Sequence, residues 1–428
     1  MVKTEYYKDL TKMNTFGMRV KARCFIEYDS VADLVDIEFG ELARPVLHIG
    51  GGSNLLFTDD FKGTVLHSKI DFIEILDECH RDGVEKLNPS HSGEWAPPVH
   101  EATGGHGFSN PPYGASSEND RVLVSVGAGV VFDDFCEWAA KEGLWGVENL
   151  SYIPGEVGAS AVQNIGAYGV EVKDVIHKVY CYDTVEEEFV HFDVEECGYG
   201  YRDSFFKSPE VKGRYIVTHV VFALSRAPQP KLEYGHLKDA VAEVASSSSD
   251  PRLRKLRHPL AEGGTSLPSD AGPDTVADCH FERSGSGDEK SLTPALIRKV
   301  IIKIRKEKLP EPSVKGSAGS FFKNPVVPME HFLKIEAAAK AEQGSDYKVP
   351  HYDLPDGMVK IPAAWMIEQC GWKGKRSGGA AVWDKQPLVI VNHTGEAYPE
   401  EIIGLEKRII ASVRTRFGVE LHPEVEHV

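Results

Sequence analysis

The sequence lacks the features that define several common classes of protein. Its seven cysteines include no C-x-x-C pair, and their odd number argues against a disulfide framework or a structural zinc site. No apolar run approaches the length of a membrane span, and the N-terminal segment has no apolar core of signal-peptide length. We therefore expect free thiols, a reducing compartment and a cytoplasmic protein without a membrane partner.

Positive charge is also in short supply. Lys and Arg together number 48 against 65 Asp and Glu, which gives a net charge of −17 at pH 7. Because nucleic-acid binding needs cations to neutralise phosphates, no nucleic-acid partner is expected. A local cluster of Lys and Arg still permits a small anionic substrate.

Two nucleotide-binding fingerprints are missing as well. No G-x-G-x-x-G opens a helix, and the glycine run at 50–52 is not followed by the Gly-Lys-Ser/Thr of a Walker loop. The length of 428 residues and the apolar content of 41% nevertheless suit a globular protein of two or three domains.

Two long segments, near 77–120 and 245–290, show no hydrophobic periodicity and are rich in small and polar residues. We expect them to be insertions without a core of their own. The first contains Cys79 and several histidines, whose spacings match no compact metal site. We therefore predict that no metal is bound.

The sequence does contain turns built from small residues. In "VLHIGGGSNLLF" (46–57), a short apolar run predicts a buried strand, and three glycines then predict a tight turn in which no side chain covers the backbone. Bare N–H groups at the end of a strand suit a phosphate. An ordinary glycine-rich turn is the alternative that this motif alone leaves open.

A similar arrangement recurs later in the chain. A strand at 122–126 leads into the turn GAG at 127–129 and then into a helix. The segment 146–172 is dense in small residues, which lets a bulky group approach the backbone closely. Two such turns and a long small-residue loop suit a dinucleotide whose pyrophosphate runs along the backbone.

Other periodic segments predict ordinary elements. Strands are expected at 64–67, 177–183, 188–192 and 215–224, and helices after Ser30, after Thr293 and over 399–416. The helix after Thr293 ends in basic residues at 305–308, which suit a pyrophosphate.

Taken together and in order, these motifs resemble those of a known family. They are GGGSN, VGAG, IPG-x-VG-x-S-x-x-QNIGAYGVE, GYRDS-x-FK, GSAGSFFKNP, GGAAV and PEV, within a resemblance that runs from Asn14 to Glu426. The family is that of the UDP-N-acetylenolpyruvoylglucosamine reductases of bacterial peptidoglycan synthesis. The resemblance implies an α+β protein with a vanillyl-alcohol-oxidase-like, two-lobed FAD-binding fold and a separate α/β substrate-binding domain.

The resemblance also implies how the chain is divided. Residues 1–68 are expected to form the first FAD-binding lobe, rejoined by about 412–428. Residues 69–309 are expected to form the second FAD-binding lobe and to carry both insertions. The substrate-binding domain is expected over 310–411.

The family's reaction is the NADPH-dependent, FAD-mediated reduction of UDP-N-acetylglucosamine enolpyruvate to UDP-N-acetylmuramate. FAD accepts a hydride at N5 and passes it to the terminal carbon of the enolpyruvyl ether, so the substrate carboxylate becomes enolate-like. Such chemistry requires a cation, a hydrogen-bonding carboxyl group and a proton donor. The resemblance assigns these roles to Arg202, Glu424 and Ser320.

Each of the three residues suits its role, and each has a plainer alternative. A guanidinium binds a carboxylate with two donors and keeps its charge, but Arg202 has Asp203 as a possible neighbouring partner. Glu424 donates a hydrogen bond only if burial keeps it protonated, and is otherwise a solvated charge near the end of the sequence, with Glu426 as its local rival. Ser320 needs a loop that aims its hydroxyl group at the carbon, and is otherwise a turn serine.

The resemblance implies FAD, with NADPH as the hydride donor. No His or Cys lies in a clear flavin-attachment pattern, so we expect the FAD to be bound non-covalently, and we expect a monomer. The residues it places around FAD are Gly50, Gly51, Gly52, Ser53, Asn54, Gly127, Ala128, Gly129, Pro154, Gly155, Gly158, Ser160, Ile165, Gly166 and Ala167. Those it places on the substrate are Tyr168, Tyr234, Arg305, Lys308, Asn324 and Gln386. Tyr234 matches a mobile, substrate-covering loop found in one subtype of the family.

Two other functions stay open at this level. One is a different oxidoreductase of the same fold, such as a sugar or alcohol oxidase, because a fold alone does not decide the reaction. The other is a catalytically silent protein that binds a sugar nucleotide. The set Arg202, Ser320 and Glu424 argues against both, since neither function requires it.

Overall fold

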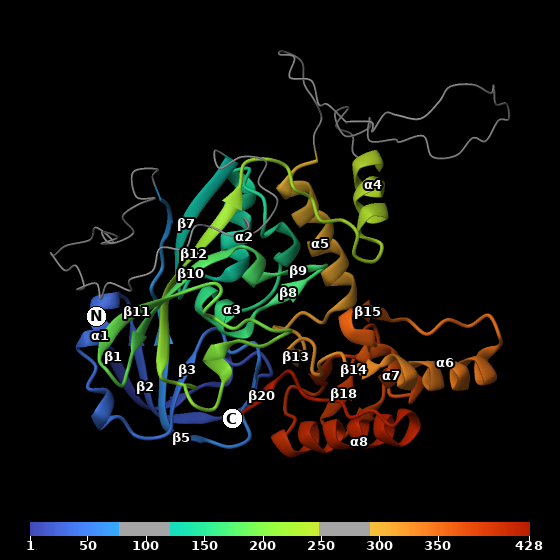
Figure 1. Ribbon diagram of the computed structural model, residues 1–428. Helices are drawn as coiled ribbons and strands as arrows, with labels where there is room; N and C mark the ends of the chain where they lie inside the picture. The colour runs from blue at the N-terminus through green and yellow to red at the C-terminus, as the bar shows by residue number, and fades with distance from the viewer. Residues whose placement is uncertain (77–119, 248–291) are drawn as a thin grey trace, which may run out of the picture.

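The computed structural model describes residues 1–76, 120–247 and 292–428, and Figure 1 shows how their elements are arranged. Most of the two predicted insertions, including Cys79 and the histidines near it, lies outside the described residues. Helix α4 (Leu237–Ser247) includes the first residues of the second insertion, so order continues slightly further than expected. Helices and strands are interspersed along the described chain, which makes the fold α+β.

The first sheet is built from the N-terminal part of the chain. Its strands, in spatial order, are β1 (Lys3–Asp9), β2 (Lys21–Tyr28), β5 (Phe61–Ser68) and β3 (Val46–Ile49). β5 pairs in parallel with both β2 and β3. Ser30 caps helix α1 (Val31–Val35) by accepting the N–H of Asp33, as its place before an apolar pattern predicts. The GGGSN turn leaves this sheet at the end of β3.

The second sheet lies above the first sheet in Figure 1. Its antiparallel strands, in spatial order, are β11 (Glu188–Asp193), β10 (Ile176–Asp183), β12 (Tyr215–Ser225), β7 (Arg121–Gly127) and β6 (Ile73–Ile75). Helices α2 (Phe132–Lys141) and α3 (Val157–Gln163) pack their apolar sides into the same core. Phe135 of α2 meets Phe222 of β12 with ring centroids 4.7 Å apart.

Helix α5 (Pro294–Lys308) connects the second sheet to the C-terminal part of the chain (Figure 1). Thr293 caps it by accepting the N–H of Leu296, and proline occupies its first turn, as the sequence predicted. Its apolar side packs against α4 in a small cluster of buried residues.

The C-terminal part contains two small sheets and three helices. The first sheet runs in the order β13 (Gly316–Ser317), β19 (Ile390–Asn392), β18 (Ala380–Val382) and β17 (Arg376–Ser377). The second runs in the order β14 (Val326–Pro328), β16 (Met358–Lys360) and β15 (Tyr352–Leu354). The helices are α6 (Met329–Gln343), α7 (Ala363–Gln369) and α8 (Pro399–Phe417).

The last residues of the chain return to the first sheet. Strand β20 (Glu426–His427) pairs in parallel with β4 (Leu55–Leu56), immediately after the GGGSN turn. One hydrophobic core joins the N-terminal and C-terminal parts, and within it Phe16 meets Phe321 edge to face, with centroids 6.2 Å apart. The exact domain boundaries stay a prediction.

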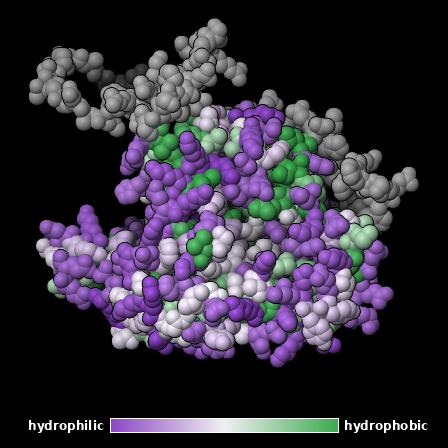
Figure 2. Space-filling model, turned by 180° about the vertical axis from the view of Figure 1, so that it is seen from behind, coloured by the Kyte–Doolittle hydropathy of each residue, from purple (hydrophilic) through white to green (hydrophobic). Residues whose placement is uncertain are grey.

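The outer surface is predominantly polar in the view from behind. Figure 2 shows hydrophilic side chains over most of this face, and its larger apolar areas lie in the upper half of the view. Among the described residues, no helix combines the length and the apolar character needed to cross a membrane.

Candidate active site

Arg202 and Glu424 form an ion pair, although they lie in distant parts of the sequence. The Arg202 Nε lies 3.1 Å from the Glu424 Oε1, and each side chain is 18% exposed. Both groups are therefore largely withdrawn from water and still reachable. The alternative partner, Asp203, is exposed and forms no ion pair with Arg202 in the described part of the chain.

Two main-chain carbonyl groups hold the other end of the guanidinium. The Arg202 Nη1 donates to Asn164 O at 3.3 Å, and its Nη2 donates to Gly166 O. A Cβ atom on Gly166 would lie 2.6 Å from Nη1, so glycine is what leaves room for the arginine. Arg202 itself has φ of 55°, a left-handed conformation that a non-glycine residue adopts only when its surroundings hold it there.

Glu424 is held by its backbone at the junction of two predicted motifs. Its N–H donates to Phe321 O at 2.8 Å, and its carbonyl group accepts from Asn54 Nδ2 at 3.1 Å. Burial raises the pKa of the Glu424 carboxyl group, against the opposing charges of Arg202 and two lysines. The protonated form therefore persists to higher pH than in an exposed glutamate, as donation of a hydrogen bond requires.

The loop that carries Ser320 runs along the C-terminal segment that carries Glu424, because Phe321 O, next to Ser320 in the chain, accepts the N–H of Glu424. Phe322 and Pro423 form an isolated β-bridge between the two segments. Gly319 turns the chain just before the serine, with φ of 68°. The Ser320 side chain is partly exposed, and its hydroxyl group has no hydrogen-bond partner among the described residues. It is therefore free to donate to a bound group.

The GGGSN turn meets a second segment predicted to hold the cofactor. A Cβ atom on Gly51 would lie 3.4 Å from Gly155 Cα, and Ser53 Oγ donates to Pro154 O at 2.9 Å. Gly52 has φ of 59°, which favours glycine. The N–H groups of Gly51, Gly52 and Ser53 have no protein acceptor within the described ranges. Uncommitted N–H groups in a glycine turn suit a phosphate, so these residues fit the pyrophosphate of FAD.

The GAG turn at 127–129 differs from the GGGSN turn in how its N–H groups are used. Its three N–H groups all donate to main-chain carbonyl groups of neighbouring segments, at 2.9 to 3.0 Å. A Cβ atom on Gly127 would lie 2.4 Å from Ile70 O, so close packing of the chain already explains this glycine. Ala128 O accepts the N–H of Gly158 at 3.0 Å, which places the turn beside α3. Contact of this turn with FAD stays a prediction.

Helix α3 leads from these turns to the arginine. Ser160 is buried in α3, and its hydroxyl group donates to Val157 O at 2.7 Å. Ile165 N–H donates to Ser160 O at 3.2 Å, and the next two residues form β8 (Gly166–Ala167), which pairs with β9 (Val170–Glu171). The segment predicted to lie beside the flavin is therefore the one whose carbonyl groups bind the guanidinium.

Aromatic residues extend from the ion pair to the predicted covering loop. Asn324 Nδ2 donates to Tyr201 OH at 3.3 Å. Tyr234 stacks on Tyr352 with centroids 6.0 Å apart, and Tyr352 OH donates to Tyr234 OH at 3.3 Å. Tyr168 meets Tyr234 edge to face, with centroids 6.2 Å apart. The structure thus brings three predicted substrate residues to one wall and adds Tyr201 and Tyr352.

The other predicted substrate residues are less closely joined to the ion pair. The Arg305 Nε donates to Tyr152 O at 3.0 Å, and burial lowers the pKa of this guanidinium. The Lys308 side chain is exposed at the end of α5, and Gln386 is partly buried. No contact among the described residues joins Lys308 or Gln386 to the ion pair.

Several residues that complete the site were not predicted from the sequence. The Lys360 Nζ lies 4.9 Å from the ring centroid of Tyr201 and 5.5 Å from that of Tyr352. Glu171 lies 3.9 Å from the guanidinium of Arg202. Tyr201, Glu171 and Lys207 belong to recognised motifs, which could have identified them. Tyr352 and Lys360 lie in a segment without any such motif.

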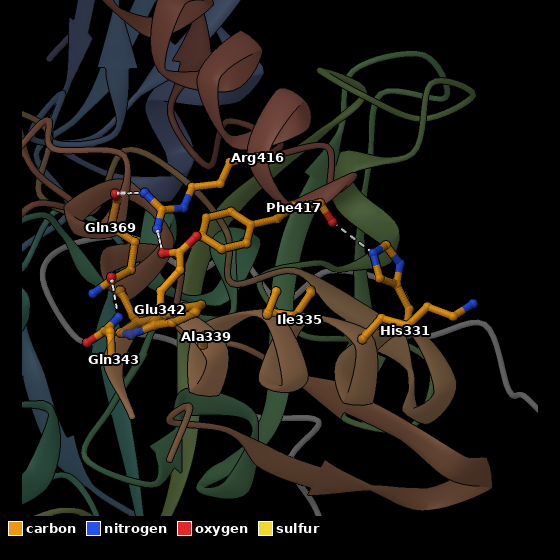
Figure 3. Close-up of a pocket in the computed structure, with 11 residues that line it drawn as sticks. His331, Ile335, Ala339, Glu342, Gln343, Gln369, Arg416 and Phe417 are labelled. Carbon is orange, nitrogen blue, oxygen red and sulfur yellow. Dashed lines mark hydrogen bonds and ion pairs between the residues drawn. The ribbon is translucent and has the colours of Figure 1, made fainter. Parts of the chain in front are cut away.

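A hollow elsewhere in the C-terminal part lies between α6, α7 and α8 (Figure 3). Ile335 and Phe417 form part of its wall, and Arg416 is paired there with Glu342. None of the predicted site residues lines it. We therefore assign no part of the chemistry to this hollow.

Comparison with known proteins first defines the class. Residues 113–192 match the family model described as an FAD binding domain, and residues 311–428 match the C-terminal domain of UDP-N-acetylenolpyruvoylglucosamine reductase. The crystal structure of UDP-N-acetylenolpyruvylglucosamine reductase from Thermus caldophilus shares the fold, with a TM-score of 0.53 and 19% identity over 100% of this chain and 98% of that chain. The protein is an FAD-binding oxidoreductase with a separate C-terminal domain.

Curated relatives narrow this class to one family. The UDP-N-acetylenolpyruvoylglucosamine reductase of Bacteroides fragilis (strain YCH46) is 41% identical over 420 residues, 98% of each chain. That of Porphyromonas gingivalis (strain ATCC 33277) is 36% identical over 424 residues, 98% of this chain and 97% of the relative. That of Neisseria meningitidis serogroup C is 38% identical over 421 residues, 98% and 96% of the two chains. The chain belongs to the UDP-N-acetylenolpyruvoylglucosamine reductase family, as the motifs predicted.

Proposed function

We propose that the protein reduces UDP-N-acetylglucosamine enolpyruvate to UDP-N-acetylmuramate, with FAD as its cofactor and NADPH as the hydride donor. The observation that carries this proposal is the ion pair of Arg202 and Glu424, formed where the Ser320 loop runs along the segment that carries Glu424. It occurs in a chain that is 41% identical over almost its whole length to a named reductase of this kind. A sugar or alcohol oxidase does not need a cation for a substrate carboxylate, and a silent binding protein does not need a proton donor.

The cofactor is expected to lie between the glycine turns and the arginine. When bound, FAD supplies the hydride that NADPH has given to it. The N–H groups of Gly51, Gly52 and Ser53 would hold its pyrophosphate, since no protein acceptor among the described residues takes them. The segment 165–167 would lie beside the flavin ring.

The substrate is bound and protonated by three residues of this chain. Arg202 binds the substrate carboxylate, because a guanidinium offers two parallel donors and a permanent charge. Protonated Glu424 donates a hydrogen bond to the same group as negative charge builds up on it. Ser320 then gives a proton to the carbon next to the carboxylate. One hydride and one proton are thereby added across the double bond.

The rest of the sugar nucleotide lies along the aromatic wall and the end of α5. Its predicted contacts are Tyr168, Tyr234, Arg305, Lys308, Asn324 and Gln386. Opposite charge places Arg305 and Lys308 near the diphosphate. The protein acts as a cytoplasmic monomer, without a nucleic-acid or membrane partner.

The two half-reactions test this function directly. The purified protein should be yellow, should bleach on anaerobic addition of NADPH, and should regain its colour when the enolpyruvyl substrate is added. NADH serves as the matched donor for measuring the cofactor preference. A colourless protein that cannot be reconstituted with FAD would exclude both flavoenzyme functions. A reduced flavin that oxygen reoxidises, but the enolpyruvyl substrate does not, would favour an oxidase.

A further inference from the structure

Lys207 closes the GYRDS-x-FK motif, and the proposed reaction has so far given it no task. It ends the 3-10 helix Phe205–Lys207, just after Arg202 in the sequence. Its Nζ donates to Gln163 Oε1 at 3.0 Å and to Arg202 O at 3.1 Å. Both acceptors are uncharged, and Lys207 forms no ion pair within the described residues. No paired carboxylate therefore compensates the positive charge of this partly buried ammonium group next to Arg202.

The hydrogen bond to Arg202 O acts on a residue in an unfavourable conformation. Arg202 has φ of 55°, which L residues adopt only where neighbouring groups hold them. Asn164 and Gly166 hold the guanidinium end of this residue. Lys207 holds its main-chain end, so the two sets of contacts together fix where the guanidinium points.

The charge of Lys207 also reaches the carboxyl group of Glu424. The charged groups that face Lys207 are Lys323, Asp203, Glu424 and Glu426. The charged groups that face Glu424 are Arg202, Lys207 and Lys323. Burial lowers the pKa of Lys207 and raises that of Glu424, because it disfavours charge on either group. Of the three cations near Glu424, Arg202 is the one paired with it directly.

We propose that Lys207 is a positioning residue, whose ammonium group holds Arg202 in its left-handed conformation and supplies positive potential to the Arg202–Glu424 pair. This inference rests on the proposed function. It assigns Lys207 to the half-reaction in which the substrate is reduced, because Arg202 and Glu424 act on the substrate carboxylate. Flavin reduction by NADPH does not depend on it.

Two substitutions separate the charge of Lys207 from its hydrogen bonds. Lys207→Met removes both. Gln163→Glu keeps the lysine and its bond to Arg202 O, and places a carboxylate against the ammonium group, which neutralises its field. Lys141→Met is the matched control, because Lys141 is an exposed lysine of α2 whose charge is paired with Glu137, away from these contacts.

The test is the rate of flavin reoxidation by the enolpyruvyl substrate as a function of pH, measured anaerobically beside the rate of reduction by NADPH. Lys207→Met should slow reoxidation by about 10- to 100-fold, the size expected for a misplaced catalytic group. The rate of reoxidation should fall above the pKa of Glu424, because the protonated form is required; we call this fall the Glu424 limb of the pH–rate profile. In both Lys207→Met and Gln163→Glu, this limb should move to higher pH, because Glu424 holds its proton more tightly with less positive charge nearby. Lys141→Met should change neither rate nor limb.

Rescue provides the second readout. Lys207→Arg should return the limb toward its wild-type position, even if a longer side chain does not restore the full rate. If Lys207→Met does not fold, Gln163→Glu decides the question alone. A limb that stays in place in every folded variant, or equal slowing of both half-reactions, would overturn the proposal. Failure of the proposed function looks different, because the wild-type flavin would then not be reoxidised by the substrate at all.

Discussion

At the scale of single residues, Glu424 is subject to two opposing influences. The guanidinium of Arg202, 3.1 Å away, favours the carboxylate, whereas burial favours the carboxylic acid and dominates. The carboxyl group therefore keeps a raised pKa beside a cation. If a substrate carboxylate takes over the guanidinium, as proposed, Glu424 would lose part of this compensation and move further toward the acid form.

The pH dependence of flavin reoxidation should report this balance. If reoxidation requires protonated Glu424, its rate should be constant below the pKa of this group and should fall about tenfold for each pH unit above it. Because the pKa is raised, the fall begins at higher pH than an ordinary glutamate would give. Glu424→Gln retains a donor that cannot titrate, so the fall should vanish while the maximal rate drops. Single-turnover reoxidation across pH measures this, and an unchanged fall in Glu424→Gln would assign the titration to another group.

Ser320 offers a second test at this scale. Ser320→Ala should slow flavin reoxidation by about 10²–10⁴-fold, the usual contribution of a general acid, and leave reduction by NADPH nearly intact. Ser313→Ala, an exposed serine that precedes the same loop, is the matched control and should change neither step. Stopped-flow measurement of each half-reaction separates the cases. Equal slowing of both steps by Ser320→Ala would refute its role as the proton donor.

At the scale of elements, prediction from the sequence succeeded where a strong periodic or capping signal exists. Helix α8 buries Ile402, Leu405 and Ile409, the side that its pattern indicates. Helix α6 buries Phe332, Ile335 and Ala339 at helical spacing, but the alanines and lysines around them weaken the contrast between its two sides, and it was not predicted. Strands β15 and β16 have three residues each, which is too short for alternation to be recognised.

The same reasoning explains which residues of the proposed site could be named from the sequence. Arg202, Ser320 and Glu424 belong to contiguous motifs whose spacing is visible in the sequence. Tyr352 and Lys360 reach the site only because β15 and β16 pair next to Tyr201, and pairing of distant segments leaves no local pattern. The dependence of the arginine on backbone carbonyl groups was equally invisible, because it follows from the fold of the segment 164–166.

A substitution at Gly166 in strand β8 tests whether Arg202 depends on these backbone carbonyl groups. Gly166→Ala would place a methyl group 2.6 Å from the Arg202 Nη1 and 2.9 Å from Val170 O, so moving the arginine alone does not make room. Reoxidation should slow by about 10²-fold through misplacement of the guanidinium. Gly404→Ala in α8 is the control, because nothing lies within 4 Å of its Cβ position, and it should stabilise the helix by about 0.5–1 kcal/mol. Normal reoxidation in Gly166→Ala would show that the carbonyl contacts do not position Arg202.

At the scale of the whole molecule, the C-terminal segment links the proposed catalytic site to the turn predicted to hold the cofactor. Asn54, in the GGGSN turn, donates through its side chain to Glu424 O and accepts the N–H of Glu426 at 2.9 Å. Beyond β20, Thr58 donates to Val428 O through both its N–H and its hydroxyl group. The turn expected to hold a pyrophosphate and the carboxyl group expected to meet the substrate are therefore parts of one hydrogen-bonded unit.

A pair of substitutions at one position tests this linkage. Glu426→Pro removes the N–H that Asn54 O accepts, and an unpaired carbonyl group costs about 1–3 kcal/mol. Glu426→Ala keeps the N–H and loses an exposed ion pair with Lys212, worth about 0–1 kcal/mol. We expect Glu426→Pro to lower both the melting temperature and the affinity for FAD, measured by flavin fluorescence titration of the apoprotein, while Glu426→Ala stays close to wild type in both. A lower melting temperature with unchanged FAD affinity would show that the glycine turn keeps its shape without the C-terminal strand.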